Sequence, residues 1–195
     1  THENSSAASD VYKRQHYTFW PGMGHLPSDV APDLRSRSYR IDVDLEVLSD
    51  RDSGVLIAHG DATGGYSLYM DNGHLVHDLN IGGTHQLLTS PKPVLPGRRE
   101  LAFVMQRQPQ DDNSVIGRAS LRVDDVEVAE LSTNSIFTLM ISWSGLDIGF
   151  DRGTTVGNYA SPFTFSGKLH KVTVDLSDDQ ELDHDGVGRA EMARE

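Results

Sequence analysis

The chain has 195 residues, no Cys and a formal net charge of −12, from 17 Lys and Arg against 29 Asp and Glu. This length suits one domain with a substantial core, and the missing Cys excludes disulfides, thiolate zinc sites and cysteine nucleophiles. The negative charge argues against nucleic acid as a partner, because phosphate contacts require clustered Lys and Arg. No apolar run approaches the ~18 residues of a membrane-spanning helix, so no membrane partner is expected.

The two ends differ in composition from the middle of the chain. Residues 1–15 show no periodicity and are expected to be disordered or to be a remnant of upstream sequence. They lack the apolar segment of a secretory signal, and the sequence leaves the compartment open. Residues 177–195 form a predicted acidic tail, because 175–195 carry eight Asp and Glu against two Arg. A calcium site there is the alternative, although the tail lacks the spacing and closing Glu of an EF-hand loop.

The first predicted strands follow one another closely. Residues 39–47 alternate strictly between apolar and polar side chains, which is typical of a half-buried strand. Residues 54–60 form a continuous apolar run bounded by glycines, which predicts a strand covered on both faces. Residues 66–70 and 75–79 flank Asn72-Gly73, a pair that supplies the positive φ angles of a tight hairpin turn.

The remaining predicted strands complete an all-β chain. Strands are expected at 84–89 and 99–105, then in a second hairpin, 119–123 and 126–131, around the turn formers Asp124-Asp125. The last two lie at 146–150 and 165–176, with a phase slip near Lys171 that predicts a β-bulge. Many short strands without helical periodicity predict a two-sheet antiparallel sandwich or jelly roll over residues 39–176.

Reaction chemistry has little support in the sequence. There is no nucleophile elbow and no phosphate loop, and the nine His lack metal-ligand spacing. His74 and His77 are three apart across a turn and a strand, which places them on opposite faces. Asp42, Asp44 and Glu46 share a strand face, but such alternation is the usual pattern of a solvated sheet. No catalytic residue and no metal ligand is therefore predicted.

One segment resembles a known family. It contains Tyr17-Thr18-Phe19-Trp20-Pro21-Gly22 and His25-Leu26-Pro27, followed by Ala31-Pro32-Asp33-Leu34-Arg35-Ser36-Arg37-Ser38. The segment resembles the opening of the C-terminal β-domain of bacterial arylsulfatases. The resemblance extends over about residues 16–176, although its later parts are shared with many laminin-G-like and concanavalin-like sandwiches.

The resemblance implies that a sulfatase catalytic domain precedes this chain in the same polypeptide. That domain would hold formylglycine and calcium, and this chain would carry no cofactor of its own. The Cys/Ser-x-Pro-Ser-Arg motif of the family is absent here, so no catalytic residue is carried over. The implied function is a non-catalytic accessory domain of a sulfuric ester hydrolase. Whether the chain is itself an enzyme stays open.

In this interpretation residues 16–38 are a proline-rich interdomain docking loop. Prolines reduce the entropy cost of docking, and arginines suit an acidic partner or a sulfate. The alternative is that the arginines pair with Asp29 and Asp33 at the surface. The predicted interdomain or substrate-entrance contacts are Trp20, His25, Arg35 and Arg37.

The second functional hypothesis is a stand-alone lectin-like module that binds a carbohydrate. Trp20 lies outside any regular strand, and both ligand stacking and burial in the core are open to it. Exposure of Trp20 together with two or more Tyr on one concave face would favour this hypothesis.

Overall fold

The computed structural model describes residues 15–109, 115–133, 135–137 and 141–182. The described residues contain strands and no helix, so the all-β prediction is confirmed. Of residues 1–15, which were expected to be disordered, only Gln15 is described, and most of the acidic tail lies outside the described residues. The strands are β1 His16–Phe19, β2 Tyr39–Val47, β3 Gly54–Asp61, β4 Gly64–Asp71, β5 His74–Ile81, β6 Thr84–Thr89, β7 Gly97–Pro109, β8 Val115–Val123, β9 Val126–Thr133, β10 Leu146–Ile148 and β11 Lys168–Leu176.

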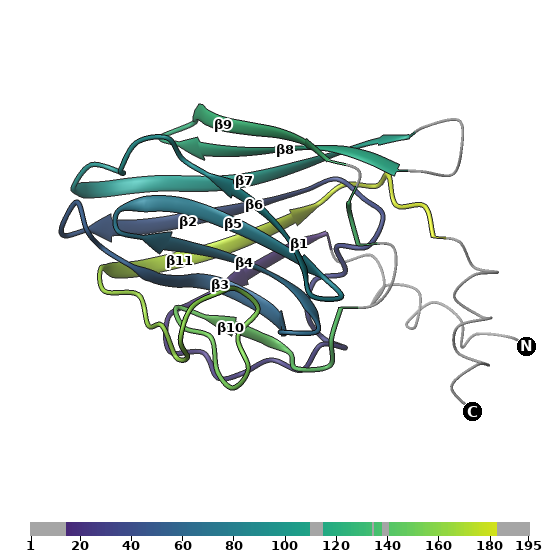
Figure 1. Cartoon of the computed structure of the whole chain (residues 1–195), viewed down its shortest axis with the longest axis horizontal. Helices are drawn as coiled ribbons and strands as arrows, with labels where there is room; N and C mark the ends of the chain where they lie inside the picture. The colour runs from purple at the N-terminus through teal and green to yellow at the C-terminus, as the bar shows by residue number, and fades with distance from the viewer. Residues whose placement is uncertain (1–14, 110–114, 134, 138–140, 183–195) are drawn as a thin grey trace, which may run out of the picture.

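The strands form two antiparallel sheets (Figure 1). The six-stranded sheet has the order β1-β11-β2-β7-β8-β9, and the five-stranded sheet has the order β10-β3-β4-β5-β6. The predicted bulge in β11 lies between Leu169 and Lys171. The Asn72-Gly73 turn adopts positive φ at both residues, 46° and 81°, as the hairpin prediction requires.

Strand β1 lies within the segment 16–38 that was expected to be a docking loop. Its Phe19 pairs with Val172 of β11 and is buried. Farther along, Leu26 forms an isolated bridge with Leu146, and the Ser36 amide donates to the Phe137 carbonyl at 2.7 Å. The segment therefore packs on the sandwich of its own chain.

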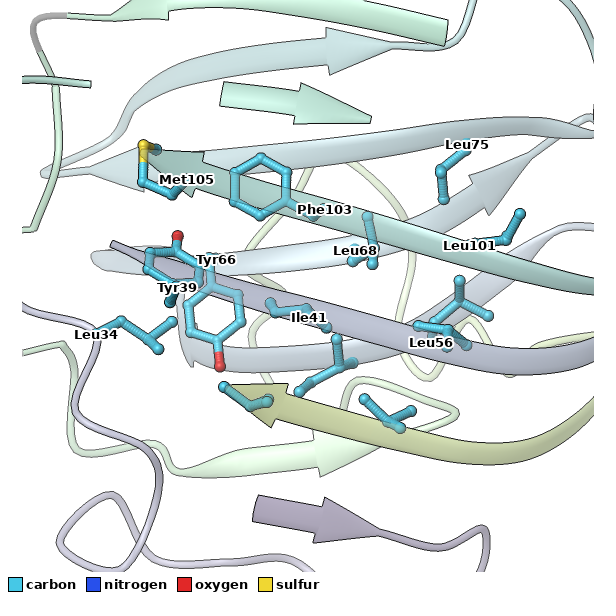
Figure 2. Packing of buried hydrophobic residues seen from close by; sticks show 14 of the residues in the cluster. Leu34, Tyr39, Ile41, Leu56, Tyr66, Leu68, Leu75, Leu101, Phe103 and Met105 are labelled. Carbon is cyan, nitrogen blue, oxygen red and sulfur yellow. The ribbon is translucent and has the colours of Figure 1, made fainter. Parts of the chain in front are cut away.

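The core lies between the two sheets and takes side chains from both. Figure 2 shows Ile41 and Phe103 from the six-stranded sheet with Tyr66 and Leu68 from the five-stranded sheet. All four side chains are fully buried. Burial of an aliphatic or aromatic side chain of this size contributes about 1.5–3 kcal/mol. Alternation along each strand sends the next side chains outward, so the core fixes what both outer faces display.

Within the described ranges, no helix is long and apolar enough to cross a membrane. The same residues contain no group of three His, Asp or Glu arranged to hold a metal ion.

Candidate functional site

The outer face of the six-stranded sheet is covered by ion pairs between its own side chains. Arg40 lies 2.7 Å from Asp42 on the same strand. Arg98 of β7 lies 2.7 Å from Asp44 of β2, and this pair bridges neighbouring strands. Arg118 of β8 contacts the carboxylates of Glu127 and Glu130 in β9. These pairs give the arginines of the face carboxylate partners, while Lys171 of β11 and Glu100 of β7 also lie on it.

The outer face of the five-stranded sheet instead holds a groove of about 570 Å³. Its floor combines the buried side chains of Tyr69 and Val76 with Leu87, which is 56% exposed. Strands β4, β5 and β6 supply these three residues in turn, so the sheet order creates the groove. The groove is lined by Tyr69, Asp71, Asn72, His74, Val76, Leu87, Thr89, Ser90 and Pro91.

Two side chains of the groove are held in place by bonds to their neighbours. His74 Nδ1 lies 2.8 Å from the Ser90 carbonyl oxygen. A carbonyl only accepts, so Nδ1 carries the hydrogen and the Nε2 of neutral His74 is an acceptor. The Asn72 amide donates to Asp71 Oδ1 at 2.9 Å, which leaves Oδ2 of Asp71 to accept from a ligand.

A second oriented imidazole lies beside the groove. His85 Nδ1 lies 3.0 and 2.9 Å from the two carboxylate oxygens of Asp78. The Asp78 side chain is 1% exposed, whereas that of His85 is 34% exposed. Burial raises the pKa of Asp78, and the hydrogen bond and charge of His85 oppose the rise. Since Nδ1 donates to the carboxylate, Nε2 of neutral His85 is again an acceptor.

The loop after β10 covers the other side of Tyr69. The ring centroid of Tyr159 lies 5.0 Å from that of Tyr69, and Phe163 stacks on Tyr159 at 4.9 Å. The Tyr159 hydroxyl donates to Asp151 Oδ2 at 2.7 Å, and Asn80 Nδ2 donates to the Val156 carbonyl at 3.2 Å. These contacts hold the loop, which we call the aromatic cap (residues 151–163), on the outer face.

Burial, together with the charges of Asp78 and Asp71, raises the pKa of Tyr69. Its hydroxyl therefore stays protonated at neutral pH and is available as a donor. The groove combines an apolar floor with neutral donors and oriented acceptors. That arrangement can bind a hydroxyl-rich, partly apolar molecule.

The predicted contact residues lie elsewhere, on the segment before β2. His25 Nδ1 is 3.1 Å from Asp147 Oδ1. Arg35 forms two hydrogen bonds with Asp33, at 2.8 and 2.9 Å, as the surface-pairing alternative expected for this arginine. Arg37 donates instead to Gln180 Oε1 at 3.1 Å. The structure thus shows each of these three residues bonded within the chain, and their role in an interdomain contact stays a prediction.

Trp20 is 54% exposed and Trp143 is 68% exposed. The described tyrosines are buried or half-buried, so Trp20 has no exposed tyrosine partner of the kind expected for a stacking face. Trp143 lies between Ser142 and Ser144, whose hydroxyls both donate to Asp61 Oδ2 at 2.5 Å. The loop is therefore fixed while the indole stays in solvent, which makes Trp143 a second candidate contact for a ligand.

A smaller hollow of about 340 Å³ lies where the segment after β6 meets the β8–β9 hairpin. Its walls are mostly apolar and include Leu95 and Val128. The Arg99 guanidinium at its rim is already paired with Asp124 at 2.9 Å. The polar side chains that line this hollow include Lys92 and Asp124.

No family model matches the chain, and no curated protein matches it. Solved structures do. The carbohydrate-binding module CBM40 of Ruminococcus gnavus IT-sialidase, bound to α2,3-sialyllactose, has a TM-score of 0.56 and 16% identity, covering 91% of this chain and 96% of that chain. Domains LG4-5 of the mouse laminin α1 chain have a TM-score of 0.52 and 12% identity, and the alignment covers 88% of this chain and 41% of the laminin chain.

The leech intramolecular trans-sialidase, complexed with 2,7-anhydro-Neu5Ac, has a TM-score of 0.51 and 15% identity. The alignment covers 91% of this chain and 27% of the trans-sialidase chain. At these identities the similarity establishes the fold alone. The chain has the β-sandwich fold found in the R. gnavus CBM40 module and in laminin LG domains.

Proposed function

We propose that this chain is a carbohydrate-binding module and that the groove on β4, β5 and β6 is its binding site. The observation that carries the proposal is the composition of the groove. An apolar floor around Tyr69 and Leu87 suits the C–H faces of a sugar ring, and Asp71 and His74 accept hydrogen bonds from its hydroxyls. On the opposite outer face, Arg40 and Arg98 already have the carboxylates of Asp42 and Asp44 as partners.

The similar structures support the same proposal. The R. gnavus module is named as a carbohydrate-binding module and was solved with α2,3- and α2,6-sialyllactose. The similarity brings only the fold to this chain, so the binding site rests on the groove itself.

The alternative role, as an accessory domain of an arylsulfatase, finds no support in the comparisons. A sulfatase catalytic domain as partner stays a prediction from the resemblance of residues 16–38. We therefore place carbohydrate binding first.

Binding of the 195-residue chain to a glycan array, followed by titration calorimetry on the best ligand, tests the proposal. We expect Asp71→Ala to weaken that binding at least tenfold, because it removes a charged hydrogen bond worth about 1.5–3 kcal/mol. Gln106→Ala is the matched control, since exposed Gln106 pairs with Arg118 in the six-stranded sheet and should leave binding unchanged.

The Trp143→Ala variant separates the groove from the exposed indole. Binding that survives Asp71→Ala but is lost in Trp143→Ala would move the site to the Ser142–Ser144 loop. If the folded wild-type chain binds no glycan, the proposal itself is contradicted.

A further inference from the structure

The groove offers a ligand two oriented hydrogen-bond acceptors. Oδ2 of Asp71 and Nε2 of His74 point to this conclusion because their partner atoms are already engaged, by Asn72 and by the Ser90 carbonyl. Beside them, neutral His85 presents a further acceptor, since its Nδ1 donates to Asp78. An acceptor pairs with a hydroxyl, which brings its own hydrogen, and not with an ionised carboxylate or sulfate, which has none.

The charged side chain that lines the groove is acidic, and Lys92, which follows the lining residue Pro91, lines the neighbouring hollow. Asp71 is at its rim, and buried Asp78 lies under its edge. None of the described residues that line the groove is Lys or Arg. Arg152, which lies in the aromatic cap, donates to Asp147 at 3.0 Å and is already paired. An anionic sugar would lose hydration here and gain no bidentate cationic partner in return.

The donors of the groove are neutral ones. The hydroxyl of Tyr69 stays protonated, and exposed Thr89 carries a second hydroxyl. Neutral donors of this kind serve sugar hydroxyls and ring oxygens. They compensate poorly for the desolvation of a full negative charge.

We propose that the groove selects uncharged, hydroxyl-rich glycans and discriminates against sialylated, sulfated or uronic-acid forms of the same glycans. This inference rests on the proposed carbohydrate-binding function and specifies its ligand class. This ligand class differs from that of the R. gnavus CBM40 module, which was solved with sialyllactose.

The test uses an array that carries neutral oligosaccharides, each printed beside its sialylated, sulfated or uronic-acid counterpart. Calorimetry then measures the dissociation constants of the best neutral ligand and of its acidic counterpart. We expect the neutral form to bind at least tenfold more tightly, with the preference narrowing as salt screens the repulsion.

A charge placed in the groove should change this selectivity. In the Thr89→Lys variant, an ammonium group enters an exposed groove position, and we expect the ratio of acidic to neutral affinity to rise at least tenfold. The matched control is Gln106→Lys, which adds the same charge to the six-stranded sheet and should leave the ratio near that of the wild type.

The outcomes separate the two proposals. Tighter binding of the acidic forms, weakened by Asp71→Ala, would overturn the ligand class and leave the carbohydrate-binding groove standing. A ratio that shifts equally in Thr89→Lys and Gln106→Lys would also overturn it, because net charge alone would then explain selectivity. Binding of no glycan in any form would overturn the proposed function and this inference together.

Discussion

The two outer faces of the sandwich are built on one core yet have opposite chemistry. On the six-stranded sheet, Arg98 and Asp44 face each other across β7 and β2 and satisfy each other's charge. On the five-stranded sheet, His74 and Asp71 are each fixed by a backbone or amide neighbour and retain a free acceptor. Arginines that already have carboxylate partners are less available to a ligand, whereas oriented single acceptors are prepared for one.

The outer face of the five-stranded sheet is also partly covered by a loop. The aromatic cap packs Tyr159 and Phe163 against Tyr69 on the five-stranded sheet. The cap fixes the floor of the groove from one side and leaves Leu87 exposed on the other. The two faces of this sandwich therefore differ in how their polar side chains are engaged, by ion pairs on one face and by single orienting bonds on the other.

The largest expected effect is a loss of unfolding free energy at acidic pH, caused by two buried histidines of the five-stranded sheet. His59 in β3 and His77 in β5 point into the core, and burial lowers the pKa of His59 to about 4 and that of His77 to about 3. Below the unfolded value of about 6.5 the unfolded chain binds more protons than the folded chain. Stability is therefore full above pH 6.5 and falls as the pH decreases towards the folded values.

Each of these two histidines should lower the free energy of unfolding by about 1.4 kcal/mol for every pH unit below 6.5. Urea unfolding at pH 7.5, 6.5 and 5.5 measures this loss. In His77→Leu about half of the slope should disappear. The offset between the two proteins at pH 7.5 reports the balance of two changes: the lost stacking on Phe103, whose ring lies 3.6 Å away, and the removal of the buried Nε2 of His77, which has no hydrogen-bond partner. Equal slopes in both proteins would show that acid does not act through this imidazole.

A smaller effect is expected from filling the space under the aromatic cap. A Cβ at Gly157 would lie 2.4 Å from Tyr159 Cε1 and 3.1 Å from Asp78 Oδ2. Overpacking of this kind costs about 1–3 kcal/mol, so Gly157→Ala should lower the unfolding free energy and weaken glycan binding together. Gly24→Ala is the control, because a Cβ there meets no atom within 4 Å. Unchanged binding in a destabilised Gly157→Ala chain would show that the cap does not support the groove.

Much of this fold could be predicted from the sequence. The alternation in residues 39–47 and the Asn72-Gly73 pair depend on local rules of period and turn geometry, and both appear as expected in β2 and the β4–β5 hairpin. Strand β1 was missed because four residues are too short for periodicity to show. Its formation depends on pairing with β11, more than 150 positions away in the chain.

The groove was not predicted, for a related reason. Its side chains come from three strands, and each looks like an ordinary outward residue until the order β4-β5-β6 sets them side by side. One signal was present: His74 and His77 were expected on opposite faces, and the structure places His74 in the groove and His77 against Phe103 in the core. A row of Tyr69, Asp71 and His74 around the predicted hairpin, without a paired basic residue, is the pattern that separates this face from the other.

The smallest effect on stability and binding is expected from a substitution on the outer face of the six-stranded sheet. This substitution tests directly whether the two outer faces differ in function. Arg98→Gln removes the partner of Asp44, but the Arg98 side chain is 72% exposed and that of Asp44 is 22% exposed, so the guanidinium is hydrated and water still reaches the carboxylate. Exposed ion pairs of this kind contribute little to stability, and salt screens them further. We expect the urea midpoint and the affinity for the best glycan to match those of the wild type. A loss of glycan affinity in Arg98→Gln would show that the paired face takes part in binding, because no bond links Arg98 to the groove and the substitution leaves the core side of β7 unchanged.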